Sequence, residues 1–179
     1  ERSDNTVIPQ VALDALHTHF GYSGFRPSQE PVVEHLLRGK DCLAIMPTGA
    51  GKSICFQIPA LLRKGLTIVF TPLISLMKDQ VDGLQLQRIP ATFINSTLDM
   101  RETNKRLWQI RKGEVKLLYI APERLGSEAF CNFLRQVPIS QIVIDEAHCV
   151  SQWGHDFRPS YGAIASFVAS LPRKPIVAA

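Results

Sequence analysis

The chain of 179 residues is about the size of one domain, and its composition is that of a globular protein. Hydrophobic residues at 45% and charged residues at 20% exclude a disordered or collagen-like chain, and no apolar run is long enough to span a membrane. The 20 Lys and Arg outnumber the 16 Asp and Glu, which gives a net charge of +4. This small excess favours a polyanionic partner, although a solvated enzyme surface explains it as well.

The cysteines are far apart in the chain, and no two of them form a Cys-x-x-Cys pair. They are Cys42, Cys55, Cys131 and Cys149. This spacing favours reduced thiols in an intracellular protein over a zinc site or a disulfide scaffold. Because no apolar run is long enough to span a membrane, we also expect no membrane partner.

Helix-like and strand-like segments alternate along the chain. In chain order the patterns predict a helix over 28–37, a strand over 41–46, a helix after the loop 47–53, a strand over 66–70, a helix over 73–87, a strand over 91–94, a helix over 99–111, a strand over 116–120, a helix over 127–136, and strands over 141–144 and 175–179. Such alternation predicts an α/β fold, with a mostly parallel sheet and helices on both faces. The active site then belongs at the carboxyl ends of the strands.

The helix predicted over 99–111 has a recognisable start and an apolar stripe. Asp99 and Glu102 have the spacing of a capping pair. Trp108 is part of the same stripe as Leu107 and Ile110, so we expect its side chain to pack in the core.

A loop with two glycines joins the predicted strand 41–46 to the helix after it. The loop reads Pro47-Thr48-Gly49-Ala50-Gly51-Lys52-Ser53. Glycines let backbone N–H groups turn toward a phosphate, and the amino end of the helix adds partial positive charge. Lys52 is expected to reach the outer phosphates and Ser53 to ligate Mg²⁺, with Thr48, Gly49, Ala50 and Gly51 lining the site. The strict pattern has glycine where this chain has Met46, and Gly49 partly compensates. A turn without a ligand is the alternative, which the combination of strand, glycines, Lys-Ser and helix disfavours.

Two adjacent carboxylates, Asp145 and Glu146, follow the predicted strand 141–144. In a parallel sheet this position brings them to the same edge as the phosphate loop. Asp145 can hold Mg²⁺ through water, and Glu146 can orient and deprotonate the water that attacks a γ-phosphate. Alone, such a pair is more often a solvated loop, but its place beside Lys52 and Ser53 favours hydrolysis of a nucleoside triphosphate.

Several motifs carry a resemblance to a known family. Residues 46–53 and Asp145-Glu146-Ala147-His148 resemble the core motifs of superfamily 2 helicases. The stretch 151–159, Ser-Gln-Trp-Gly-His-Asp-Phe-Arg-Pro, resembles the aromatic-rich loop of RecQ-family DNA helicases. Residues 20–29, 71–80 and 119–125 resemble the adenine-recognition motif, motif Ia and the motif Ib region of that family, in the family's order. The sequences of these motifs resemble those of the bacterial members more than those of the eukaryotic members.

The resemblance implies that residues 1–179 form the first, RecA-like motor domain of a helicase. It implies ATP and Mg²⁺ as cofactors, single-stranded or partly duplex DNA as partner, and movement three-prime to five-prime in DNA repair and recombination. It also implies a second RecA-like domain of the same protein, and we expect this chain to be a fragment that ends just before motif III. A bacterial protein of this kind would be cytoplasmic and associated with the nucleoid, and a eukaryotic one nuclear.

The adenine-recognition motif has its own chemistry. Gln29 carries one acceptor and two donors that suit the N6 and N7 edge of adenine, while Tyr22 and Arg26 can stack on the ring. The alternative is that Gln29 only caps the helix predicted over 28–37.

Other residues are candidates for contacts with DNA. Ser75, Lys78 and Arg124 can hold backbone phosphates, or they are ordinary surface residues. Trp153 and Phe157 offer faces for unpaired bases, and Arg158 offers charge. A buried role for Phe157 is the alternative.

Two histidines, His148 and His155, lie between the carboxylates and these aromatics. Through them, a bound strand can influence Glu146, so that DNA controls hydrolysis. Structural hydrogen bonds by both histidines are the alternative.

Two other functions stay open at this point. The chain could be a nucleotide-responsive DNA-binding module that does not unwind, or an RNA-directed ATPase of the DEAH type. The loop that carries Trp153 argues against the RNA-directed ATPase.

Overall fold

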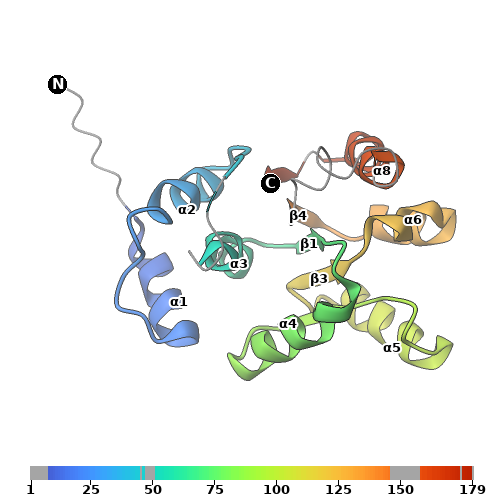
Figure 1. Cartoon of the computed structure of the whole chain (residues 1–179), viewed down its shortest axis with the longest axis horizontal. Helices are drawn as coiled ribbons and strands as arrows, with labels where there is room; N and C mark the ends of the chain where they lie inside the picture. The colour runs from blue at the N-terminus through green and yellow to red at the C-terminus, as the bar shows by residue number, and fades with distance from the viewer. Residues whose placement is uncertain (1–7, 45, 47–50, 146–157, 174, 179) are drawn as a thin grey trace.

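A computed structural model of the chain describes residues 8–44, 46, 51–145, 158–173 and 175–178 (Figure 1). Five parallel strands form one sheet: β1 Leu66–Phe70, β2 Ala91–Phe93, β3 Leu117–Ile120, β4 Ile139–Ile144 and β5 Ile176–Ala178. Their order across the sheet is β2-β3-β1-β4-β5, with β1 in the centre between β3 and β4. The prediction of a parallel sheet is confirmed.

The helices agree with most of the predicted segments. They are α1 Gln10–Phe20, α2 Glu30–Leu37, α3 Lys52–Leu62, α4 Ile74–Leu86, α5 Met100–Arg111, the 3-10 helix η1 Pro122–Gly126, α6 Glu128–Arg135 and α8 Arg158–Ala169. The Asp99 side chain accepts a hydrogen bond from the Glu102 backbone N–H at 2.7 Å, so the predicted cap at the start of α5 is confirmed.

Helices cover both faces of the sheet. Neighbouring residues of each strand point to opposite faces, so β1 and β3 each contribute to two clusters. Val69 and Tyr119 belong to a buried cluster with Met77 of α4, and α3 also contributes to it. Ile68 and Leu118 belong to a second cluster, on the other face, to which α5, α6 and α8 contribute. All residues of β1 and β3 are buried, as expected for strands that are covered on both sides. A third cluster joins α1 and α2 to α3, at the left of Figure 1.

The strand predicted over 41–46 is not found among its described residues. Only Cys42 forms a single β-bridge there. Cys42 packs against the first cluster, but the next residue, Leu43, is 72% exposed. Leu43 is therefore not enclosed as it would be in an inner strand.

Helix α8 was not predicted from the sequence. The segment contains Pro159 and Gly162, which lower the expected helical propensity. A weak signal was nevertheless present, because Ile164, Phe167 and Leu171 recur at spacings of three and four and are all buried in the second cluster.

The expectation that Trp108 packs in the core is wrong. Its side chain is 55% exposed, and the Lys112 ammonium lies 3.9 Å from the ring centroid. Ile110, only two positions along α5, is 2% exposed and part of the core. Residues two apart on a helix do not share a face, so the core can hold Ile110 or Trp108 but not both.

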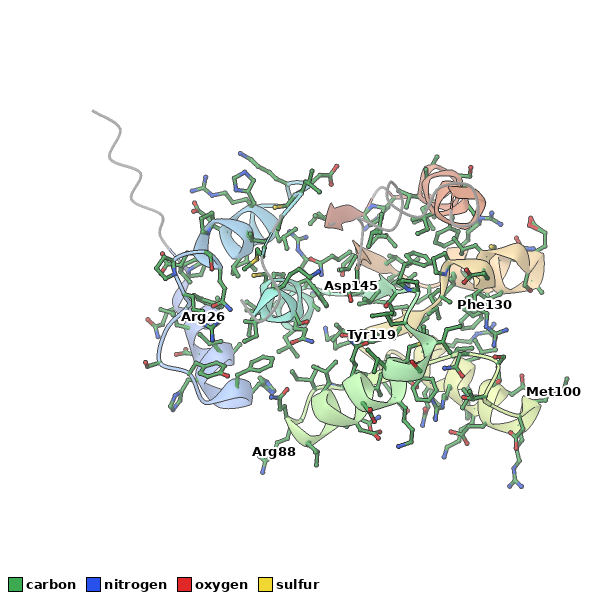
Figure 2. All side chains as sticks on the ribbon, in the orientation of Figure 1. Arg26, Arg88, Met100, Tyr119, Phe130 and Asp145 are labelled. Carbon is green, nitrogen blue, oxygen red and sulfur yellow. The ribbon has the colours of Figure 1, made fainter. Side chains whose placement is uncertain are left out.

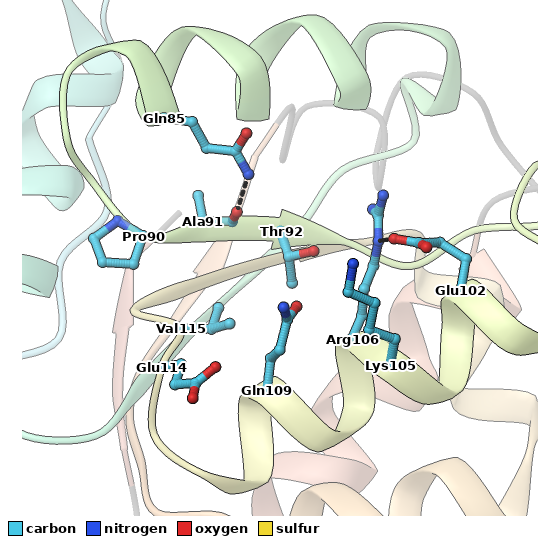
Figure 3. Close-up of a pocket in the computed structure, with 10 residues that line it drawn as sticks. All are labelled: Gln85, Pro90, Ala91, Thr92, Glu102, Lys105, Arg106, Gln109, Glu114 and Val115. Carbon is cyan, nitrogen blue, oxygen red and sulfur yellow. Dashed lines mark hydrogen bonds and ion pairs between the residues drawn. The ribbon is translucent and has the colours of Figure 1, made fainter.

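The outer edge of the sheet, along β2, is closed by side chains (Figure 3). The Ala91 carbonyl accepts a hydrogen bond from Gln85 Nε2 at 2.9 Å, and the Phe93 carbonyl accepts one from Arg106 Nη1 at 2.8 Å. Glu102 holds Arg106 in place at 3.0 Å. Edge strands whose backbone groups are occupied in this way are protected from pairing with other chains.

The contrast between Trp108 and Ile110 leads to a stability prediction. Replacing Ile110 by alanine should lower the free energy of unfolding by about 2–5 kcal/mol, because it leaves a cavity in the core. Replacing Trp108 by alanine should cost less than about 1 kcal/mol, as is usual for exposed positions. Urea denaturation followed by circular dichroism measures both changes. Equal losses in the two variants would show that Trp108 is a core residue after all.

Candidate functional site

The centre of the candidate site is an ion pair between two segments that are far apart in the chain. Lys52 opens α3, and Asp145 directly follows β4 beside that helix (Figure 2). The Lys52 Nζ atom lies 3.2 Å from Asp145 Oδ1, with the side chains 38% and 12% exposed. The Asp145 backbone N–H donates to the Phe70 carbonyl at 2.9 Å, which fastens the end of β4 to the end of β1. The sequence placed both groups at the carboxyl edge of the sheet, and the structure brings them into contact there.

Gly51, the residue before Lys52, has a conformation and surroundings that require glycine. Its φ is +72°, in the left-handed region. A Cβ atom at this position would lie only 2.4 Å from Gln29 Nε2. The backbone can therefore approach the Gln29 amide closely only because residue 51 has no side chain.

Gln29 is almost fully buried, at 3% exposure, and both ends of its amide are bonded. Its Nε2 donates to the Gly51 carbonyl at 3.0 Å, and its Oε1 accepts from the Arg26 backbone N–H at 2.8 Å. It occupies the N-cap position of α2 but makes no side-chain capping bond to that helix. In the structure Gln29 thus connects the adenine-motif segment to the last residue of the phosphate loop, while its contact with adenine stays a prediction.

Two further members of the adenine motif lie between α1 and α2. The Arg26 guanidinium reaches the neighbourhood of Gly51, at 3.9 Å from the position of an ideal Cβ. Tyr22 is 53% exposed. Both side chains are therefore on the surface, and Arg26 borders the phosphate loop.

The first turn of α3 supplies the remaining described groups of the phosphate site. Ser53 is exposed in this turn, where backbone N–H groups of the helix have no partner within the helix. Several predicted site residues lie outside the described residues: Thr48, Gly49, Ala50, Glu146, His148, Trp153, His155 and Phe157. Arg158 is the first residue of α8, and its side chain also lies outside the description.

The candidate residues for contacts with DNA phosphates lie in helices that follow strands at the same edge of the sheet. Ser75 and Lys78 are exposed on α4, which follows β1, and the half-buried Arg124 lies in η1, which follows β3. Lys78 forms an ion pair with Asp82 at 2.5 Å, and this hydrogen bond raises the pKa of Lys78. The structure thus places these three residues at the carboxyl edge, where Asp145 also lies, and their contacts with DNA stay predictions.

Two buried glutamines position α3 against the sheet, and sequence reasoning missed both. Gln57 Nε2 donates to the Tyr119 hydroxyl at 3.4 Å, and Gln141 Nε2 donates to the Phe56 carbonyl at 3.2 Å. Both amides are less than 10% exposed. Their signal in the sequence is a polar residue inside an otherwise apolar helix or strand.

Burial affects the acid–base behaviour of residues behind the site. Tyr119 is 2% exposed, and burial raises its pKa to about 12, which the Gln57 hydrogen bond partly opposes. Burial likewise raises the pKa of Cys55 to about 11. Cys42, Cys55 and Cys131 are free thiols.

Comparison with known proteins places this geometry in context. A family model described as DEAD/DEAH box helicase matches residues 26–179. The chain is 48% identical over 171 residues to the ATP-dependent DNA helicase RecQ of Pasteurella multocida, covering 96% of this chain and 27% of that protein. It is 49% identical over 169 residues to the ATP-dependent DNA helicase RecQ of Bacillus subtilis, covering 94% of this chain and 29% of that protein. The chain therefore spans less than a third of the length of these relatives.

A eukaryotic relative and a solved structure are also similar. The ATP-dependent DNA helicase Q5 of Rattus norvegicus is 44% identical over 167 residues, covering 89% of this chain and 17% of that protein. A solved structure described as a hypothetical ATP-dependent RNA helicase from Sulfolobus tokodaii has a TM-score of 0.71 and 18% identity, covering 96% of this chain and 50% of that one. This likeness confirms the RecA-like helicase fold.

A pair of glycine substitutions tests the geometry at Gly51. Gly51→Ala should lower the free energy of unfolding by about 1–2 kcal/mol, because alanine is strained at this φ and its Cβ displaces the Gln29 amide. Gly83→Ala is the control, since a Cβ there meets nothing within 4 Å and α4 should gain up to about 1 kcal/mol. Urea denaturation measures both. A neutral Gly51→Ala would contradict the close approach of Gln29.

The buried Tyr119 predicts a dependence of stability on alkaline pH. Its pKa rises from an ordinary 10.0 to about 12 on folding, so its stabilising contribution is present below pH 10 and is lost as the pH rises toward 12. The free energy of unfolding should fall by roughly 1 kcal/mol per pH unit in this range. Denaturation at several pH values measures the slope. Tyr119→Phe should have a shallower slope, and an unchanged slope would exclude Tyr119 as its source.

Proposed function

Because the chain belongs to the DEAD/DEAH box helicase family and is similar to RecQ helicases, we propose that it is the first, ATP-hydrolysing motor domain of a DNA helicase. The observation that carries the proposal is the ion pair of Lys52 and Asp145 at the carboxyl edge of the sheet. This ion pair places a cation that can bind phosphate beside a carboxylate that can bind a metal ion.

The described residues fit a triphosphate with its metal ion. The amino end of α3 and the Lys52 ammonium attract the phosphates. Ser53 and Asp145 offer a hydroxyl and a carboxylate, the hard oxygen donors that Mg²⁺ prefers. Among the described residues there is no cluster of three His, Cys, Asp or Glu that could hold a metal by itself. A Mg²⁺ site does not need one, since phosphate oxygens and water complete the coordination, and the bound ion would neutralise charge on the phosphates.

The same residues suggest how hydrolysis proceeds. In our proposal Lys52 leaves Asp145 and turns to the phosphates when the triphosphate binds, which frees the Asp145 carboxylate for the metal. Glu146, the next residue, orients the attacking water and takes its proton. The water oxygen bonds to the γ-phosphorus, and the bond to the bridging oxygen of the diphosphate breaks.

Adenine recognition is proposed for the segment between α1 and α2. The bonded position of Gln29 supports this role, because its amide is held at a fixed place beside the phosphate loop. The Gly51 bond uses one N–H of the Nε2 group, and in our proposal the other N–H donates to the base. Tyr22 and Arg26 would then stack on the ring.

DNA binding is proposed for the carboxyl edge as well. Ser75, Lys78 and Arg124 follow strands that end there, which supports a path for the DNA backbone across this edge. The aromatic loop with Trp153, Phe157 and Arg158 would stack unpaired bases, and His148 and His155 would couple it to Glu146.

The activity of the whole protein follows from the relatives and stays part of the proposal. They are named DNA helicases, and this chain spans only 27–29% of the bacterial ones, which supports a second RecA-like domain in the same protein. We propose movement three-prime to five-prime during DNA repair and recombination, in the bacterial cytoplasm on the nucleoid or in a eukaryotic nucleus. No described helix is both long and apolar enough to cross a bilayer.

The proposal predicts the outcome of an ATPase measurement. Release of phosphate from ATP by the chain should increase with single-stranded DNA. Glu146→Gln should lower turnover by about 10²-fold or more while ATP still binds, because it removes the base. Lys52→Ala should instead weaken ATP binding.

Lys105→Ala is the control, because Lys105 is exposed beside β2, away from the site. Its ATP binding and its release of phosphate from ATP should equal those of the chain without the substitution. Turnover that DNA does not stimulate would favour a nucleotide-responsive DNA-binding module over a motor. Stimulation by RNA but not by DNA would favour an RNA-directed ATPase.

A further inference from the structure

A pocket of about 440 Å³ opens at the amino edge of the sheet, opposite the edge of Lys52 and Asp145. It is formed by the turn before β1, the connection from α6 to β4 and the segment after α8, which meet because parallel strands start at one edge. Helices α6 and α8 lie on the same side of the sheet in Figure 1. The six residues of β4 separate the pocket from Asp145 by about 20 Å. The nucleotide and DNA sites proposed above therefore do not include it.

Positive charge is concentrated around this pocket. Lys64, Arg135 and Arg173 line it, and no acidic residue of the described chain does. None of the three forms an ion pair with a described acidic side chain. Lys64 and Arg173 are exposed, so their charges face solvent at the mouth.

Arg135 is held in a defined orientation. Its Nε donates to Ser170 Oγ at 3.0 Å, its Nη1 donates to Asn132 Oδ1 at 2.7 Å, and its guanidinium lies 6.0 Å from the Phe167 ring centroid. These bonds use two of the five N–H donors of the guanidinium. The others are pre-positioned for a planar anion such as a carboxylate.

The remaining wall of the pocket is largely apolar. It consists of Val137, Pro138, Ile139, Leu171 and Pro172, with Gln136 beside them. These side chains are aliphatic or proline rings, and no described lining residue is aromatic. Unpaired bases bind by stacking on aromatic rings, so this wall suits an aliphatic side chain better than a base.

We propose that this pocket docks an acidic peptide segment of a partner protein, in which carboxylates flank an apolar side chain. The carboxylates would pair with Lys64, Arg135 and Arg173, and the apolar side chain would lie on the wall formed by Ile139 and Leu171. A volume of 440 Å³ is within the usual range of pockets for small ligands, so the site suits a short linear motif and not a large protein surface. Because the pocket is at the amino edge, a partner could bind while the carboxyl edge is occupied.

Binding of defined probes to the 179-residue chain tests the proposal. The probe is a fluorescently labelled eight-residue peptide of alternating glutamate and leucine, measured by fluorescence anisotropy. Peptides of alternating lysine and leucine, and of glutamate and serine, report on charge and apolar contact separately. Labelled oligothymidylate reports on DNA.

The double variant Lys64→Glu with Arg173→Glu should bind the glutamate–leucine peptide at least tenfold more weakly. Both side chains are exposed, so the fold should be kept, and a thermal melt checks this. Lys105→Glu makes the same kind of charge change on another surface and should leave the affinity unchanged, and Lys64→Arg should preserve it. Rising salt should weaken binding, as for an exposed charged interface.

Three outcomes would overturn the proposal. The first is no binding of the glutamate–leucine peptide, and the second is equal loss in the Lys105→Glu variant. The third is a double variant that loses affinity for oligothymidylate but not for the peptide, which would make the pocket a nucleic-acid contact. None of these results depends on ATP turnover, so the proposed function is tested separately.

Discussion

The contact between Lys52 and Asp145 depends on two unrelated parts of the chain ending at one edge of the sheet. Lys52 begins the helix after the phosphate loop, and Asp145 directly follows the strand next to the central one. An ammonium and a carboxylate at 3.2 Å, both partly shielded from water, attract each other more strongly than a fully exposed pair would. In the proposed function, phosphate, metal and attacking water converge at this meeting point.

Buried amides fix the position of that meeting point. Gln57 and Gln141 bind α3 to β3 and β4, and Gln29 binds the loop before α3 to the segment between α1 and α2. A buried amide without partners is costly, so each of these side chains favours one arrangement of the elements over others. The Oε1 atom of Gln141 is buried and has no partner among the described residues, which is the exception in this group. The amides therefore restrict how α3 and its lysine can shift.

The two edges of the sheet have different chemistry. The carboxyl edge carries Lys52, Asp145, Ser75 and Arg124, as the parallel topology requires. The amino edge carries a basic pocket with an aliphatic wall. If both proposals hold, the separation of the two edges would let the domain bind nucleotide and DNA at one edge and a partner peptide at the other.

The type of fold and the edge at which the site lies could both be predicted from the sequence. Alternating apolar runs and capped helices were sufficient to predict the parallel sheet, because these patterns depend on local periodicity and on residues close in the chain. The same holds for the cap at Asp99 and for the shared edge of Lys52 and Asp145. The failures are local as well. Pro159 and Gly162 hid the helical pattern of α8, and the stripe assigned to Trp108 ignored that Ile110 lies on a different face of the helix. The apolar run 41–46 forms no strand among its described residues.

Contacts between side chains that are far apart in the chain could not be predicted from the sequence and are seen only in the folded arrangement. Nothing near Gln29 in the sequence indicates that its amide bonds to Gly51, or that Gly51 must be glycine for this reason. The pocket of Lys64, Arg135 and Arg173 likewise arises from three segments that become neighbours when parallel strands align. Periodicity specifies which face of an element is buried, whereas packing of the whole chain selects the partner that each face or polar group finds.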